Sequence, residues 1–201
     1  MELEETFRRR KMVRSFRPDP VPDDVIDRVM ASVLHAPSAG YTQGNEFLVL
    51  SSHDAVAEYV RITEHPDYPL GDADRNVLPP VVVVPMSNQA AYIDRYSQSD
   101  KIEFGLDAAE RWPVPYWDID AGMASMLILL AAVDCGLGAL FAGIAYGEAE
   151  LLNHFRVPGA FRPIGVIHLG YPTEVDEQSS SSSARKRGRR GIDQLIHRNR
   201  W

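Results

Sequence analysis

Residues 119–133 read IDAGMASMLILLAAV, and from Met123 onward they form the longest apolar run in this chain of 201 residues. Asp118 and Asp120 lie at the start of the run, and Asp134 follows it. The run is too short, and its ends are too acidic, for a membrane span. It therefore predicts a buried core helix that is capped by Asp118 or Asp120, and no association with a membrane.

The segments on either side of this helix predict short strands and helices of ordinary length. Four consecutive valines at 81–84 follow two prolines, a pattern typical of a strand that is buried on both faces. Further strands are expected at 47–50, 139–144 and 164–169, and helices at 2–11, 22–35, 53–63, 90–96, 148–155 and 192–197. This mixture, with 45% hydrophobic residues, indicates a globular α+β or α/β protein.

Cysteine usage and the first residues predict the compartment. Cys135 is the single cysteine, so no intramolecular disulfide can form and a reducing compartment fits. The opening residues, MELEETFRRRK, lack the apolar core of a signal peptide. We therefore expect a cytoplasmic protein in which Cys135 packs inertly within the apolar helix.

The basic residues are strongly segregated. The net charge is −7, yet 13 of the 21 basic residues lie in two short segments, 8–17 and 185–201. Two basic ends suit a compact anion that both ends bind, whereas the acidic body between them would repel a nucleic-acid duplex. The alternative interpretation is that both ends are solvated, poorly ordered tails.

Familiar catalytic motifs are absent from the sequence. It has no Walker loop and no Gly-x-Gly-x-x-Gly after a strand, and its 6 histidines are too scattered for metal-ligand spacing. A protein of this kind is still an enzyme if a cofactor carries the chemistry. We expect no metal site and name no catalytic side chain.

Three segments carry short motifs: RKMVRSF at 10–16, APSAGYTQ at 36–43 and RGRRGI at 187–192. They resemble, in that order, the Arg-Arg-Ser-x-Arg-x-Phe motif, the Ala-Pro-Ser-x-x-Asn-x-Gln loop and the closing basic motif of the nitroreductase family. Segments 118–122, 136–139 and 162–172 are similar to the family's central helix, the exit from that helix and the last core strand. The resemblance covers nearly the whole chain in the family's order.

The resemblance implies an α+β fold, with a central, mostly antiparallel sheet flanked by helices, in one domain over residues 1–201. It also implies an intertwined homodimer with FMN at the interface. The five serines at 179–183 form a flexible linker to a tail, 184–201, that would embrace the partner subunit. Apolar residues in this tail predict a short docking helix: Ile192, Leu195, Ile196 and Trp201.

The same resemblance implies which residues contact the flavin. Arg10 and Arg14, with Lys11 and Met12 between them, would bind its phosphate or ribityl chain, because guanidinium forks bind phosphate in a bidentate way. From the tail, Arg187 and Arg189 would reach the same phosphate.

The isoalloxazine ring would lie against two other segments. Pro37, Ser38 and Ala39 would lie along the ring from the other subunit, and Tyr41 and Gln43 belong to the same motif. Backbone amides of Ala142 and Gly143 would stand near the reactive ring nitrogen, where they stabilise negative charge.

Several positions depart from the family pattern and indicate a divergent branch. Met12 replaces a frequent serine and Tyr41 a frequent asparagine, while Gly44 and Asn45 replace Pro-Trp. The blocks RWPVPYW at 111–117 and DRY at 94–96 resemble a group of actinobacterial members. Aromatic side chains here would either stack on a planar substrate or anchor their loop to the core: Tyr96, Trp112, Tyr116 and Trp117.

The resemblance implies an FMN-dependent oxidoreductase that works by a ping-pong scheme. NAD(P)H would reduce FMN and leave, and a planar acceptor such as a nitroaromatic or a quinone would then take the electrons. Two alternatives remain open, since Met12, Tyr41 and the tryptophan-rich loop depart from the family pattern. One is a non-catalytic FMN-binding or storage protein, and the other is specialised flavin chemistry such as dehalogenation or flavin fragmentation. A nucleic-acid-binding protein with basic tails is a further alternative, although we expect no nucleic-acid partner.

Overall fold

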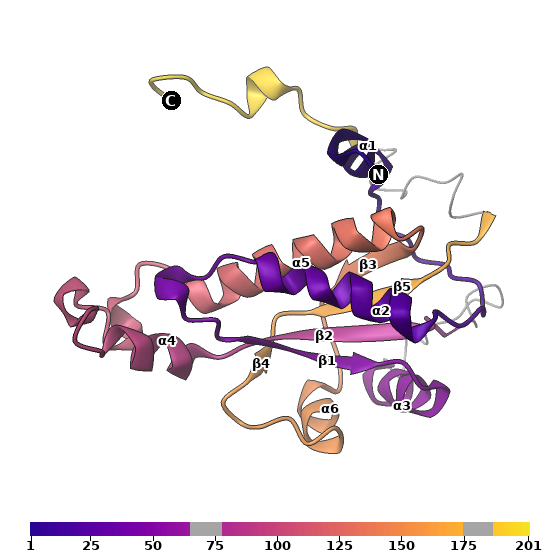
Figure 1. Ribbon diagram of the computed structural model, residues 1–201, viewed down its shortest axis with the longest axis horizontal. Coiled ribbons are helices and arrows are strands. Elements are labelled where there is room, and N and C mark those ends of the chain that lie inside the picture. The colour runs from indigo at the N-terminus through magenta and orange to yellow at the C-terminus, as the bar shows by residue number, and fades with distance from the viewer. Residues whose placement is uncertain (65–77, 175–186) are drawn as a thin grey trace.

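The computed structural model describes residues 1–64, 78–174 and 187–201, and an antiparallel sheet lies at its centre between two layers of helices (Figure 1). The strands are β1 (Asn45–Leu50), β2 (Val81–Ser87), β3 (Gly138–Ala142), β4 (Arg162–Pro163) and β5 (Val166–Gly170). Their order is β1-β2-β5-β3, with β4 also paired to β2, and every pair is antiparallel. The predicted α+β class with an antiparallel sheet is confirmed.

Strand β2 is the centre of the core. All seven of its residues are buried, as the run of valines predicts. Side chains alternate along a strand, so Val81 and Val83 pack into one apolar cluster while Val82 and Val84 pack into a second. The sheet therefore needs helices on both faces.

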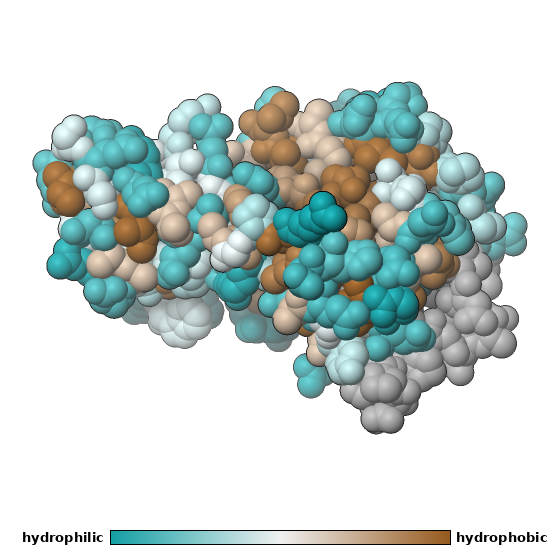
Figure 2. Space-filling model, turned by 90° about the horizontal axis from the view of Figure 1, so that it is seen from below, coloured by the Kyte–Doolittle hydropathy of each residue, from teal (hydrophilic) through white to brown (hydrophobic). Residues whose placement is uncertain are grey.

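Helices α2 (Asp23–Met30) and α5 (Tyr116–Asp134) cover the upper face of the sheet (Figure 1). Acidic residues in the first turn of α2 favour its start, and the 3-10 turn η1 (Ala31–His35) continues it. Pro37 disfavours helical geometry in the residue before it, and the helical segment ends at His35. The lower face is covered by α3 (His53–Thr63) and α6 (Glu148–His154). Seen from below, this side is largely polar, with apolar groups gathered between the polar ones (Figure 2).

The remaining elements are short and lie around this core. They are α1 (Leu3–Arg9), α4 (Gln89–Tyr96), η2 (Ala39–Tyr41), η3 (Ile102–Phe104), η4 (Ala109–Arg111) and η5 (Ile192–Gln194). The helix predicted at 192–197 is thus only a single 3-10 turn. The serine linker at 179–183 lies outside the described residues.

The central helix starts earlier than the sequence predicts. Pro115 occupies the N-cap position of α5 and offers no side-chain cap, so the prediction that Asp118 or Asp120 caps the helix is wrong. Both carboxylates lie inside the helix and bind partners from other segments. Cys135, which the sequence places within the helix, is instead its C-cap residue. Its Sγ lies 3.1 Å from Nε of Arg28.

By length and composition α5 is the one helix among the described residues that could cross a membrane. Half of its apolar window is buried inside the chain. Ile128, Leu129 and Ala132 pack against β2, β3 and β5 in the core. The buried half of its apolar residues is therefore explained by its place against the sheet.

His168 gives the fold a pH dependence. It lies on β5 with Nε2 3.0 Å from the hydroxyl of Tyr59, and burial lowers the pKa of His168 to about 4. The unfolded chain then binds more protons than the folded chain between pH 6.5 and 4, so the free energy of unfolding falls as the pH drops through this range. At pH 5 the loss is about 2 kcal/mol relative to pH 7.

Urea unfolding at both pH values, at one protein concentration, measures this effect. His168→Gln keeps a partner for Tyr59 but cannot be protonated, so the variant should lose about 2 kcal/mol less than the parent. Equal pH dependence in both proteins would show that His168 is not the titrating group.

Candidate functional site

The basic N-terminal segment is fixed along the edge of the sheet. The amide of Val13 donates to the Ala139 carbonyl at 2.9 Å, and Met12 bridges Ala139 beside β3. Val13 is buried. The sulfur of Met12 lies 3.4 Å from the Phe141 amide, where a thioether is only a weak acceptor. The segment therefore runs beside the first residues of β3, and the Met12 side chain extends along the strand as far as Phe141.

Within this segment, Arg10 has an unsatisfied hydrogen-bond donor that a bound ligand would satisfy. Its Nη1 is buried and has no hydrogen-bond partner among the described residues. A buried donor without an acceptor costs free energy, and more so when it is charged. Arg14 donates to the Met12 carbonyl at 3.3 Å. An anion placed here would satisfy Arg10.

The end of β3 has room for a flat group. Ala142 pairs with Val166 in the sheet, and the next residue, Gly143, is exposed. A Cβ atom built on Gly143 would meet nothing within 4 Å. The unpaired Arg10 donor fits the anionic arm of a cofactor, and the backbone at Gly143 is open to solvent.

The segment 36–44 forms a tight loop at the other edge of the sheet, before β1. The Gln43 amide donates to Ser38 Oγ at 2.9 Å, and the Ala39 amide donates to Asp120 at 2.8 Å. Tyr41 and Gln43 have φ of 56° and 53°, a left-handed conformation that costs about 1–3 kcal/mol for each non-glycine residue. The Tyr41 residue is 78% exposed. Left-handed conformations of non-glycine residues, such as those of Tyr41 and Gln43, are common at ligand sites.

Within one chain these two segments lie at opposite edges of the sheet. The register Phe141↔Ile167, Ile167↔Val83 and Val83↔Val49 places β3 and β1 three strand spacings apart, which is about 14 Å. The two segments are therefore too far apart to contact the same atoms of a ligand from one chain.

The other basic residues predicted to bind the cofactor lie in two places. Lys11 lines an open hollow of about 400 Å³ with Arg9, Val133 and Gly136. Arg187 and Arg189 are exposed, on a tail that runs away from the body near α1 (Figure 1). Neither tail arginine is packed against the body of this chain.

The aromatic residues of 92–117 form a packed cluster. Tyr92 is fully buried, Trp112 and Trp117 are each 8% exposed, and the rings of Tyr96 and Trp112 meet edge to face at 4.7 Å. The Trp112 indole also donates to the Leu106 carbonyl. These contacts anchor the loop 97–115. Substrate contact by Tyr96, Trp112, Tyr116 and Trp117 remains a prediction, and Tyr116 is the most exposed of these four residues.

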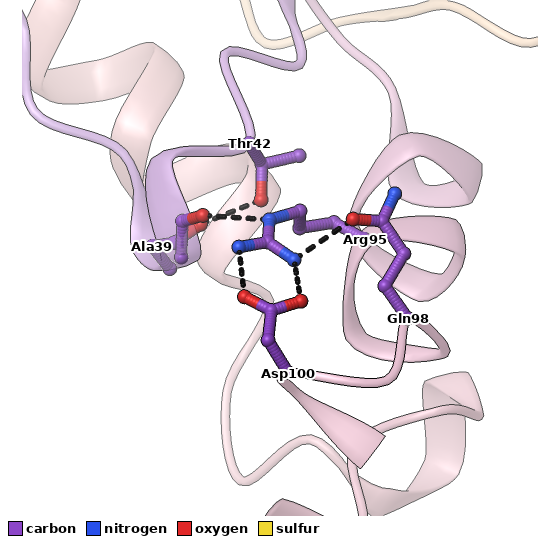
Figure 3. Close-up of polar contacts among 6 residues, drawn as sticks. Ala39, Thr42, Arg95, Gln98 and Asp100 are labelled. Atoms are coloured by element: carbon purple, nitrogen blue, oxygen red, sulfur yellow. Dashed lines mark hydrogen bonds and ion pairs between the residues drawn. The ribbon is translucent and has the colours of Figure 1, made fainter.

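Sequence reasoning missed four residues that hold the 36–44 loop. Asp120 and Tyr92 contact it from one side, and Arg95 with Asp100 contacts it from the other (Figure 3). A carboxylate near the start of an apolar helix was the available signal for Asp120, but it was interpreted as a cap.

A family model described as the Nitroreductase family matches residues 7–171. The chain belongs to the nitroreductase family. The matched range includes both the Arg10 segment and the 36–44 loop, and it ends before the tail.

Relatives of this nitroreductase-family chain span nearly its full length. A protein of Methanothermobacter thermautotrophicus with the provisional name NADH dehydrogenase/NAD(P)H nitroreductase is 25% identical over 177 residues, which are 87% of this chain and 79% of that protein.

Two solved structures share the fold. A nitroreductase family protein of Streptococcus pneumoniae has a TM-score of 0.72 at 20% identity, covering 98% of this chain and 99% of the other. A provisionally named nitroreductase of Desulfovibrio desulfuricans, solved in complex with FMN, has a TM-score of 0.69 at 20% identity, covering 98% and 95%.

Proposed function

We propose that this chain is a cytoplasmic, homodimeric, FMN-dependent oxidoreductase that takes electrons from NAD(P)H. The observation that carries the proposal is the buried Nη1 of Arg10, which has no hydrogen-bond partner among the described residues. Membership of the family, a relative named for NAD(P)H and a structural neighbour solved with FMN support it.

Each element of the site has a separate part in binding. Arg10 and Arg14 hold the phosphate and ribityl arm, and the backbone amides at Ala142 and Gly143 stand at the ring edge. Residues 37–43 of the second subunit cover the ring and exclude water. The bound flavin supplies the hydride chemistry, accepting from NAD(P)H and then passing electrons to a planar acceptor such as a nitroaromatic or a quinone.

The exposed apolar face of α5 supports the dimer. Ile119, Met123 and Met126 are exposed at spacings of four and three residues, which places them on one side of the helix. Leu3 and Phe7 of α1 are exposed as well. An exposed apolar helix face of this kind marks a protein interface, and in the proposed dimer a second copy would also complete the flavin site.

The purified protein and its turnover test the proposal. We expect a yellow protein that releases FMN and not FAD, and that oxidises NADH or NADPH when a nitroaromatic or quinone is added. A colourless protein that does not take up added FMN would contradict the cofactor assignment. A yellow protein without turnover would instead favour the non-catalytic FMN-binding alternative.

The tail is proposed to dock on the partner subunit. Ile192, Leu195, Ile196 and Trp201 are all exposed in the isolated chain, and Trp201 is 99% exposed. A solvated tail has no need of four large apolar residues. Docking would bring Arg187 and Arg189 to the phosphate of a shared site.

Replacing Arg187 and Arg189 by alanine should weaken FMN binding without dissociating the dimer. Each charge-assisted contact contributes about 1.5–3 kcal/mol, whereas the apolar docking residues are unchanged. Fluorescence titration with FMN and sedimentation measure the two properties, with Arg198→Ala and Arg200→Ala as a matched control. Unchanged affinity in the double variant would show that the tail does not reach the flavin.

A further inference from the structure

We propose that Asp120 and Arg95 are positioning residues that clamp the 36–44 loop from two sides and hold it in its flavin-facing conformation. This inference rests on the proposed function, because the loop is the part of the chain assigned to the flavin ring. Neither residue belongs to the motifs that the sequence offered for the cofactor.

Asp120 forms one side of the clamp. Its side chain comes from α5, and the residue is 1% exposed. One carboxylate oxygen, Oδ2, accepts from the Ala39 amide at 2.8 Å and from the Tyr92 hydroxyl at 2.7 Å. Burial and the adjacent carboxylate raise the pKa of Tyr92 well above its usual value, so the hydroxyl remains a donor. The loop amide is thus tied to the buried aromatic cluster.

Arg95 forms the other side, from α4 (Figure 3). Its Nε donates to the Gly40 carbonyl at 2.9 Å. Its two terminal nitrogens bind the two carboxylate oxygens of Asp100 at 2.8 and 2.7 Å, and Nη1 also donates to Gln98. This fork fixes the direction in which Nε points.

The backbone between the two contacts has little freedom. Gly40 has φ of 61°, and a Cβ atom there would lie 2.7 Å from the Tyr96 ring. Tyr41 and Gln43 follow in left-handed conformations that persist only when the surroundings impose them. The Ala39 amide and the Gly40 carbonyl are held just before these two residues, so the clamp is placed where the strain begins.

The clamp also joins two functional loops. Tyr92 and Tyr96 lie on α4 and pack on Trp112, which anchors the loop 97–115. The flavin-facing loop and the loop proposed to meet the acceptor therefore form one unit through α4.

Asp120→Ala, Asp120→Asn and Asp118→Ala test the first side of the clamp. Alanine leaves the Ala39 amide and the Tyr92 hydroxyl without an acceptor, so the FMN dissociation constant should rise about tenfold or more. Asparagine still offers an oxygen to both donors and should stay within about threefold of the parent. Asp118 is the matched control, because it lies on the same helix but binds Ser87 and Arg162 and not the loop. Its alanine variant should also stay within about threefold.

Arg95→Ala and Arg111→Ala test the second side. Arg111 pairs with Asp107 in the same region and donates to no residue of the loop. Arg95→Ala should weaken FMN binding and change the visible circular dichroism of the bound flavin, and Arg111→Ala should do neither. The two clamp substitutions should be non-additive when combined, since they act on one loop. If Asp120→Ala does not fold, the arginine pair decides the question.

The outcomes separate the clamp from the proposed function. Unchanged FMN affinity and visible circular dichroism in both Asp120→Ala and Arg95→Ala would overturn the clamp while the parent remains a flavoprotein. An equal loss in Asp118→Ala and Asp120→Ala would also overturn it, because the effect would then be general to the helix. A parent protein that binds no FMN at all would overturn the proposed function and the clamp together.

Discussion

Replacing both Arg10 and Arg14 by alanine is expected to raise the FMN dissociation constant about 10²–10⁴-fold, because two charge-assisted contacts of about 1.5–3 kcal/mol each are lost. Arg10 carries a buried Nη1 without a partner among the described residues, which is the state of a side chain that awaits an anion. The free variant should also be no less stable than the free parent, since it removes an uncompensated buried donor.

Fluorescence titration with FMN measures the affinity, and thermal unfolding without FMN measures the stability. Arg17→Ala is the matched control, because Arg17 lies on the same segment but pairs with Asp19 and stacks over Tyr171. It should bind FMN as the parent does. An Arg10 and Arg14 variant that keeps the parent's affinity would place the phosphate elsewhere.

Much of the fold follows from local sequence patterns. The four valines predict the central strand, and the helix expected at 53–63 is observed as α3 (His53–Thr63). A strand that is buried on both faces is recognised from its own run of apolar residues. The start of α3 is recognised from its capping residue, Ser52. The start of α5 could not be predicted in the same way, because Asp118 and Asp120 resemble caps until their partners are known.

The residues of the candidate site likewise divide into those that the sequence makes evident and those that it does not. Arg10 and Arg14 are conspicuous in the sequence because basic residues are concentrated there. Asp120 and Arg95 are not, because their partners Ala39 and Gly40 lie 81 and 55 residues away. Contacts of this length depend on how α4 and α5 pack against the loop, and no periodicity or spacing records that packing.

For the aromatic residues, residue type alone does not distinguish substrate binding from packing. Trp112 and Trp117 look equally suited to binding a planar substrate and to anchoring a loop. Their burial against Tyr92 and the indole bond of Trp112 account for both of them structurally. Tyr41, by contrast, is exposed in a strained loop, so under the proposed function it is the aromatic side chain available to the flavin.

Mixing two defective chains is expected to restore flavin binding, because the proposed site takes residues from both subunits. One chain carries Arg10→Ala and Arg14→Ala. The other carries Gly40→Val, whose side chain would meet the Tyr96 ring and whose backbone φ of 61° is unfavourable for valine. Each homodimer has two defective sites. A heterodimer instead has one site with both defects and one site with neither.

Coexpression with two different affinity tags isolates the heterodimer, and its FMN content gives the result. About half of the heterodimer's sites should bind FMN with the affinity of the parent, whereas both homodimers should remain nearly free of it. The restored fraction follows from two-fold symmetry, because each site takes its basic segment from one chain and its loop from the other. If the segments of one chain served the same flavin, every site in the heterodimer would keep one defect and no FMN would be recovered. A heterodimer without FMN would therefore refute the shared site, even if the parent protein is yellow.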